Sequence, residues 1–171
     1  AAHHVGIEVA TAREALLEFK GVKRRMELRG TVEGVKVYDD FAHHPTAIEL
    51  TLQGIAAKLR ADGGDSRLIA VIEPRSNTMK SGVHQHEFNI ACQAADMVIW
   101  FKPEDAKINF STLLAESIVP AYVFSDVDQI VTFLEESSIP GDHIVIMSNG
   151  GFGGIHDKLL QALQHGPSLL N

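Results

Sequence analysis

Four uninterrupted apolar runs of strand length recur along the chain, and they constrain the fold more than any other feature. None of them shows the polar alternation of a strand that faces water on one side. Such runs are typical of a parallel sheet whose two faces are both covered. The four runs are RLIAVIE at 67–73, DMVIWF at 96–101, PAYVF at 120–124 and HIVIMS at 143–148.

Segments with helical periodicity lie between these runs. After Pro45, a residue suited to a first helical turn, apolar residues follow at spacings of four, three and four. The apolar helix positions are Ile48, Leu52, Ile55 and Leu59, then Val127, Ile130, Val131 and Leu134, and finally Ile155, Leu159 and Leu163; a further helix is expected at 84–95. This order predicts an α/β fold, a mostly parallel sheet with helices on both faces.

The start of the chain has a different pattern. Residues 11–19 favour a helix that Gly21 would end, and we expect this helix to belong to a linker. RMELRG and VKVYDD flank a TVEG turn, and their apolar and polar residues alternate. This alternation predicts an antiparallel hairpin at the N-terminal side of the domain.

Composition excludes several classes of protein. The 171 residues are 45% hydrophobic and 22% charged, as in an ordinary single globular domain. The net charge is −7 and no basic face is visible, so we expect no nucleic-acid partner. The single Cys92 excludes an internal disulfide and favours a reducing, cytoplasmic location. We expect no membrane association, because no apolar run approaches the roughly 20 residues of a membrane span and no signal peptide is visible.

The first unusual loop is DDFAHHPT at 39–46, between the hairpin and the first helix. Two carboxylates beside two imidazoles can accept, donate and relay protons near neutral pH, and a helix start favours an anion. Alternatively, Asp39 and Asp40 are solvated turn residues and one histidine packs inside. The pattern alone leaves both interpretations open.

The second loop is EPRSNTMK at 73–80, after the first long apolar run. Arg75 could grip a carboxylate through its planar guanidinium while Ser76, Asn77 and Thr78 fix the orientation. A plain turn with an exposed arginine is the alternative.

The third loop is SNGGFGG at 148–154, after the last apolar run. Glycine-rich turns before a helix expose backbone N–H groups to anions. The run matches neither the Walker A spacing nor GxGxxG, so tight turning alone would also explain the glycines.

His84 and His86 form an HxH pair, but two such residues on one helix point to different sides. No cysteine or third ligand accompanies them at a metal spacing, and we expect no metal site. Trp100 and Phe101 end an apolar run and are expected in the core.

Four motifs in sequence order, GVKRRME, YDDFAHHPT, EPRSNTMK and SNGGFGGIH, together resemble the C-terminal domain of the Mur ligases. The likeness covers about residues 18–165. The resemblance implies an enzyme of three domains: one for the UDP-sugar, a central P-loop ATPase and this Rossmann-like domain. Residues 1–20 then resemble the end of the central domain's last helix and the linker, and 21–171 the C-terminal domain.

The resemblance also implies an activity. Mur ligases form an amide bond between UDP-N-acetylmuramate, activated by ATP, and an amino acid or peptide. The implied amine donor is the murein tripeptide L-alanyl-γ-D-glutamyl-meso-diaminopimelate of peptidoglycan recycling. ATP and Mg²⁺ would be bound mainly by the central domain, so the chain alone is expected to be inactive.

Residue roles follow from the matching motif positions. Arg25 resembles the arginine that contacts the nucleotide, and Asp40 the aspartate that holds the ATP ribose. His43 resembles a histidine of the amino-substrate pocket and is the candidate catalytic residue, which would orient the amine or take its proton. Arg75 resembles an arginine that pairs with a substrate carboxylate. The other substrate-binding candidates are Phe41, His44, Asn77, Thr78, Ser148, Asn149 and Phe152.

Departures from the family patterns bear on specificity. Phe41 and Thr78 stand where the L-alanine-adding ligase has a tyrosine and a second arginine, which suits a wider pocket for a tripeptide. The lysine of the D-glutamate-adding ligase and the DNPR motif of the diaminopimelate-adding ligase are both missing. Two alternatives stay open: an L-alanine-adding ligase domain, and a non-catalytic binding module on the same fold.

Overall fold

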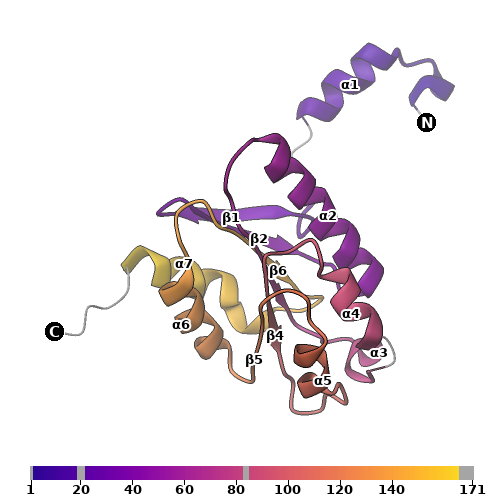
Figure 1. Cartoon of the computed structure of the whole chain (residues 1–171). Helices are drawn as coiled ribbons and strands as arrows, with labels where there is room; N and C mark the ends of the chain where they lie inside the picture. Colours follow the sequence, from indigo (N-terminus) through magenta and orange to yellow (C-terminus); the bar gives the residue numbers. More distant parts are fainter. Residues whose placement is uncertain (1, 19–21, 83–84, 166–171) are drawn as a thin grey trace.

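A computed structural model describes residues 2–18, 22–82 and 85–165 and confirms the predicted α/β fold (Figure 1). One sheet holds six strands in the order β1-β2-β6-β3-β4-β5. β1 pairs antiparallel with β2, and the other pairings are parallel. The strands are β1 Glu27–Val32, β2 Val35–Asp40, β3 Leu68–Ile72, β4 Met97–Phe101, β5 Ala121–Phe124 and β6 His143–Met147.

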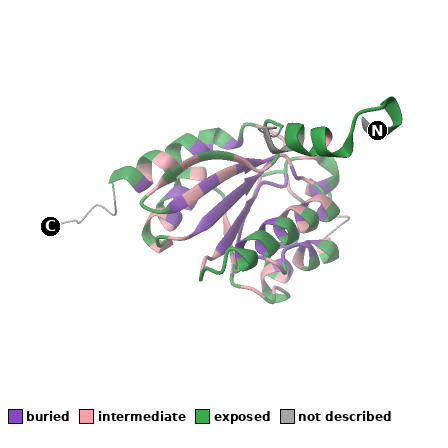
Figure 2. Ribbon diagram, turned by 90° about the horizontal axis from the view of Figure 1, so that it is seen from above, coloured by how far each residue is buried: buried purple, intermediate pink, exposed green. Residues whose placement is uncertain are grey.

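Helices cover both faces of the sheet, as predicted. One core lies between the sheet and α2 to α5, and a second core lies between the sheet and α6 and α7. Figure 2 shows the buried strands between helices whose outer surfaces are exposed. The helices are η1 Ala2–Val5, α1 Val9–Glu18, α2 Pro45–Ala61, α3 Asn77–Lys80, α4 Gln85–Ala91, α5 Phe110–Ala115, α6 Val127–Ser137, η2 Phe152–Gly154 and α7 Ile155–His165. Within the described ranges, no helix has the length and apolar character of a membrane span.

Local sequence explains why α2 forms and how it is oriented. Pro45 occupies the first turn, where a missing N–H leaves no hydrogen bond unmade. Ile48 and Leu52 are fully buried against the sheet. Lys58 and Arg60 lie in the last turn, where positive charge complements the helix dipole. The helix therefore runs from the carboxyl edge of the sheet back toward its amino edge, one face in the core.

The predicted hairpin is confirmed, with its turn at Glu33 and Gly34. Both residues have positive φ, 49° and 80°, a conformation that glycine adopts without strain. The β1 register shifts between Leu28 and Gly30. A Cβ on Gly30 would lie 2.8 Å from Leu160 of α7, so the glycine lets α7 pack closely against the edge strand.

Several helix bounds differ from the prediction. α4 ends at Ala91 rather than continuing through 84–95, and His84 lies outside the described residues. α3 and α5 were not predicted, because helices of four and six residues are too short to show an apolar period. α1 ends at Glu18 and projects from the body of the domain in Figure 1. The expected stop at Gly21 lies outside the described residues.

Residues predicted to be structural lie in the first core. Cys92 is a free and buried cysteine, and burial raises the pKa of its thiol to about 12. Such a thiol stays protonated and unreactive near neutral pH. Trp100 is 1% exposed and its ring lies 5.4 Å from that of Phe88, so its place in the core is confirmed.

A buried carboxylate ties together the amino ends of the two central strands. Asp142, fully buried before β6, accepts hydrogen bonds from Arg67 Nε at 2.8 Å and Nη2 at 2.6 Å. The backbone N–H of Ile139 donates to the same carboxylate at 2.9 Å, and Arg67 also donates to the carbonyl of Ser137. The bond to Asp142 raises the pKa of Arg67. Through these bonds, the Arg67 side chain joins the start of β3 to the end of α6 and, through Asp142, to the start of β6.

Replacing Asp142 with alanine should lower the free energy of unfolding by about 2–4 kcal/mol, because Arg67 and Ile139 N–H lose a shared charged acceptor. Urea denaturation with an unchanged m-value would measure the loss. The matched control is Asp105→Ala, which removes an ion pair to Lys80 at 2.6 Å whose carboxylate is 68% exposed. That change should leave the free energy of unfolding close to the parental value, because solvent screens this ion pair. Equal losses in the two variants would contradict the role given to Asp142.

Candidate functional site

The polar loops after β2, β6 and β3 lie at the same edge of the sheet, because these strands are parallel neighbours. The chain leaves β2 and β3 toward helices on one face, but it leaves β6 toward α7 on the other face. Connections that depart to opposite faces open a crevice at the carboxyl ends of the strands, where α/β proteins bind ligands. The topology therefore brings together the three loops that the sequence marked as unusual.

Ser148 joins the three loops. Its backbone N–H donates to the carbonyl of Asp40 at the end of β2, at 3.1 Å. Its hydroxyl donates to the Glu73 carboxylate after β3 and accepts from the N–H of Gly150 at 2.9 Å. Ser148 is 1% exposed and Glu73 is 9% exposed. The hydroxyl predicted to meet substrate is thus used inside the protein, where it holds the loops in place.

Arg24 adds a second set of bonds that the sequence analysis missed. Its Nη2 donates to the carbonyls of Ser148 at 2.5 Å and Gly150 at 2.8 Å, and its Nε donates to Asp39 at 3.4 Å. The guanidinium lies 5.1 Å from the ring centre of Phe41. Arg24 has a φ of 57°, an uncommon left-handed conformation that turns it inward. The sequence did indicate that a second arginine stands next to Arg25 in KRRME, but only Arg25 matched the family motif.

Arg25, the neighbour of Arg24, is exposed. Asp40 is 2% exposed, and its carboxylate oxygens accept from the N–H groups of Ala42 and Met26, each at 2.8 Å. Asp40 thereby fixes the turn before β1 against the loop after β2. Arg25 is free to meet a ligand from outside, whereas the Asp40 carboxylate already serves two backbone donors.

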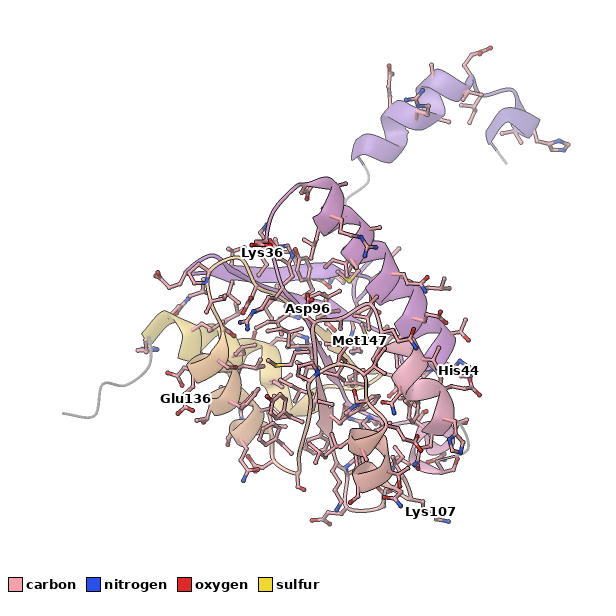
Figure 3. The ribbon with its side chains drawn as sticks, in the orientation of Figure 1. Lys36, His44, Asp96, Lys107, Glu136 and Met147 are labelled. Atoms are coloured by element: carbon pink, nitrogen blue, oxygen red, sulfur yellow. The ribbon has the colours of Figure 1, made fainter. Side chains whose placement is uncertain are left out.

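His43 is half-buried beside Phe41. Its Nδ1 lies 2.8 Å from the Phe41 carbonyl oxygen, and the two rings meet edge to face with centres 5.2 Å apart. A carbonyl oxygen only accepts, so Nδ1 carries a proton, and in the neutral form of the ring the lone pair is on Nε2. His44 is exposed at the N-cap of α2, and Figure 3 shows it on the outside of the domain.

Arg75 is exposed and its side chain lies against Gly150. A Cβ built on Gly150 would be 2.2 Å from Arg75 Nη1 and 2.6 Å from its Cδ, so a larger residue would displace the guanidinium. Asn77 and Thr78 are exposed in the short helix α3, which Ser76 caps through a bond from Met79 N–H. The loops after β3 and β6 therefore present Arg75 on a glycine surface with two polar side chains nearby in sequence.

The other two candidates of the glycine-rich loop differ in burial. Phe152 is 1% exposed, packs against Phe101 with ring centres 5.5 Å apart and belongs to the second core. The prediction that it lines the substrate pocket is not supported, because a side chain this buried has no surface to offer. Asn149 is half-buried, and its Oδ1 is buried without a hydrogen-bond partner among the described residues.

Asp39 faces the opposite side of the sheet from Asp40, as alternate residues of a strand must. It lies 3.4 Å from Arg24, 3.8 Å from Arg29 and 3.5 Å from His156 Nε2. Burial lowers the pKa of His156, and the Asp39 carboxylate opposes that effect in part. Asp39 is therefore a buried structural carboxylate that anchors Arg24. The alternative interpretation, in which Asp39 and Asp40 are solvated turn residues, is wrong for both.

Metal binding has no support from the part of the chain that the structure describes. In those residues, no group of three or more His, Cys, Asp or Glu side chains is placed to hold a metal ion. His84 of the HxH pair lies outside the described residues.

The fold and these loops define a class: an α/β ligand-binding domain whose polar loops project from the carboxyl edge of a mostly parallel sheet. A sequence model described as "Mur ligase, glutamate ligase domain" matches residues 24–150. The chain belongs to the Mur ligase family, as its C-terminal domain, and the expected family is confirmed.

Relatives within the family differ in similarity. The chain is 47% identical over 163 residues to the UDP-N-acetylmuramate–L-alanyl-γ-D-glutamyl-meso-2,6-diaminoheptandioate ligase of Escherichia coli (strain K12), covering 95% of this chain and 35% of that protein. It is 31% identical over 170 residues to the UDP-N-acetylmuramate–L-alanine ligase of Mycobacterium sp. (strain JLS), with 96% and 35% covered. The crystal structure of a murein peptide ligase from Psychrobacter arcticus 273-4 matches with a TM-score of 0.76 at 44% identity, over 98% of this chain and 35% of that one. The chain thus spans about a third of the length of these relatives.

Replacing Arg24 with alanine should destabilise the domain by about 2–3 kcal/mol, because two carbonyls lose a charged donor. Urea unfolding would give the free energy, and hydrogen exchange should show faster exchange at the amides of 149–151. The adjacent Arg25→Ala is the matched control and should stay within about 0.5 kcal/mol of the parent. If the two variants had equal unfolding free energies and equal exchange rates at 149–151, Arg24 would not hold the loops.

Proposed function

We propose that this chain is the C-terminal domain of a cytoplasmic, ATP-dependent ligase that joins L-alanyl-γ-D-glutamyl-meso-diaminopimelate to UDP-N-acetylmuramate in peptidoglycan recycling. Family membership supports the reaction class. The 47% identity with the E. coli tripeptide ligase, against 31% with an L-alanine ligase, supports the substrate. Residues 1–20 would be the helix end and linker of a central domain, and 21–171 the C-terminal domain. The partners would be the two substrates and the enzyme's own N-terminal and central domains.

The contact between Arg75 and Gly150 is the observation that carries the proposal. It joins the loop after β3 to the loop after β6 and leaves an exposed guanidinium over a flat glycine surface. A planar guanidinium binds a carboxylate through two parallel hydrogen bonds. The murein tripeptide carries free carboxylates, and we assign one of them to Arg75.

His43 would act on the attacking amine. Its Nδ1–H is held by the Phe41 carbonyl, so the ring is oriented and Nε2 is the basic nitrogen. In this role Nε2 accepts a hydrogen bond from the tripeptide's amino group and so directs the lone pair of the amine nitrogen at the carbonyl of the acyl phosphate. Nε2 receives the amine's proton as the C–N bond forms and the C–O bond to the leaving phosphate breaks. Because the ring is already held in place, less rotational freedom has to be lost when the amine attacks.

Asn149, Asn77, Thr78, His44 and Phe41 complete the proposed substrate surface. The unpartnered Oδ1 of Asn149 suits a peptide N–H, because a buried acceptor without a donor is costly until it is satisfied. The side chains of Asn77 and Thr78 are exposed and offer donors and acceptors beside Arg75. Phe41 would supply an apolar wall, already held by Arg24 and His43.

Nucleotide contact is proposed for Arg25 and Asp40, with ATP and Mg²⁺ held mainly by the central domain. When bound, ATP supplies the phosphoryl group that activates the muramoyl carboxylate. Arg25 fits this role, since it is exposed and carries a charge that phosphate attracts. Asp40 fits only in part, because its oxygens already accept two backbone N–H groups and the residue is 2% exposed. Its firmer role is to fix the turn that presents Arg25.

An L-alanine-adding ligase is the second candidate, favoured by the 31% identity with that relative over 96% of the chain. A full-length ligase would then use L-alanine in preference to the tripeptide. A non-catalytic module is the third candidate, and it requires that the loop residues have no effect on ligation.

Steady-state ligation by the full-length enzyme tests the substrate. With ATP and UDP-N-acetylmuramate, kcat/KM for the tripeptide should exceed that for L-alanine by at least about a hundredfold, because the peptide offers more groups to the loops. The 171-residue chain alone is the control and should yield no ligated product. Preference for L-alanine would establish the second candidate. Ligated product from the 171-residue chain alone would contradict the proposal that the other domains are needed for the reaction.

Arg75→Ala in the full-length enzyme should weaken tripeptide capture by about 2–5 kcal/mol, because a desolvated carboxylate loses its cation. Arg75→Lys should be impaired as well, since an ammonium cannot form the paired contact. Gly150→Ala should also weaken tripeptide capture, because the added methyl group displaces the Arg75 guanidinium. Arg60→Ala, at an exposed arginine of α2, is the control. Parental KM values in all the Arg75 and Gly150 variants would remove the assigned role.

A further inference from the structure

A cavity lies at the amino edge of the sheet, away from the loops described above. It measures about 400 Å³ and is walled by the second half of α2, by β2 and by the start of β6. Its size is in the range of small-molecule sites. Figure 3 shows Lys36, one of its lining residues, at the end of the molecule opposite Lys107. Its lining includes Lys36, Tyr38, Leu50, Gly54, Lys58 and His143.

The rim of this cavity is positive. Lys36 and Lys58 both line it, and among the described residues neither ammonium has an ion-pair partner. Both lysines lower the pKa of His143, so their positive charges act on the residue that forms part of the cavity floor. Asp62 is the single carboxylate of the lining, which leaves an excess of positive charge. Such a rim attracts an anion.

The floor is uncharged and flat. Tyr38 Oη lies 3.0 Å from His143 Nδ1, and the two rings are stacked with centres 5.7 Å apart and planes at 14°. Burial is the main cause of the lowered pKa of His143, which therefore stays neutral near pH 7. Met26, Leu50, Ile55 and Leu59 add apolar side chains to the lining. A flat apolar body can lie on this floor with its charge at the rim.

Gly54 keeps the cavity open. A glycine inside a helix weakens the helix, so its presence in the middle of α2 calls for a reason. A Cβ added at Gly54 would meet no atom within 4 Å, and the residue lines the cavity. Packing therefore does not require glycine here, and a larger side chain would project into the open volume.

We propose that this cavity is a binding site for a small organic anion, a molecule with one carboxylate, sulfonate or phosphate group on a flat apolar body. The anionic group lies between Lys36 and Lys58, and the apolar body lies on the Tyr38 and His143 rings. The site is separate from the tripeptide and nucleotide loops, and it does not depend on the ligase assignment.

The fluorescence of 8-anilinonaphthalene-1-sulfonate with the 171-residue chain tests the site. The parent should bind one dye saturably, and Gly54→Leu should weaken binding at least about tenfold by filling the volume. Lys36→Gln should weaken it by about threefold to tenfold through the lost charge. Lys107→Gln is the matched control and should bind as the parent does. Equal binding by the parent and Gly54→Leu would overturn the proposal.

Two further measurements keep the outcome decisive. Gly54→Leu should unfold at the parental temperature or above it, and if it unfolds earlier, the comparison of Lys36→Gln with Lys107→Gln decides instead. Displacement of the dye by benzoate, with no displacement by inorganic phosphate at the same concentration, would support an organic anion. Equal displacement by phosphate would overturn that ligand class.

Discussion

The buried hydrogen bond between the Ser148 hydroxyl and the Glu73 carboxylate is the interaction on which the loop edge depends. A carboxylate removed from water is costly unless strong donors meet it, so Glu73 holds Ser148 in place. Ser148 in turn fixes Gly150, and Arg24 clamps the carbonyls of both residues. The exposed groups proposed to meet substrate rest on this inner layer, although few of its members would touch a ligand.

The two ends of the sheet are organised by different means. At the amino edge, the Asp142 carboxylate joins Arg67 and the start of β6 in a single buried bond network. At the carboxyl edge, three loops meet through backbone carbonyls and one serine. Fully buried β3 and β6 connect the two edges, so a rigid central pair supports both. Rigid support of this kind suits loops that must hold their side chains in fixed positions.

Most of the fold was predictable because the signals were local and long enough. The buried strands and α2, α6 and α7 each show a continuous apolar run or a helical stripe. The short helices α3 and α5 escaped prediction, since four and six residues contain too little of a period. Their existence depends on caps such as Ser76 and Asn109, and on tertiary packing that a single segment does not reveal.

The sequence by itself determined the fold class and which loops carry polar chemistry, because periodicity and residue type act within a segment. Only the tertiary structure decided which side chain of each loop points inward. Arg24 is bound inside whereas Arg25 is exposed, and Ser148 and Phe152 are buried whereas Arg75 is exposed. Those choices depend on left-handed turns and on contacts across neighbouring strands, which join residues more than a hundred positions apart in the chain.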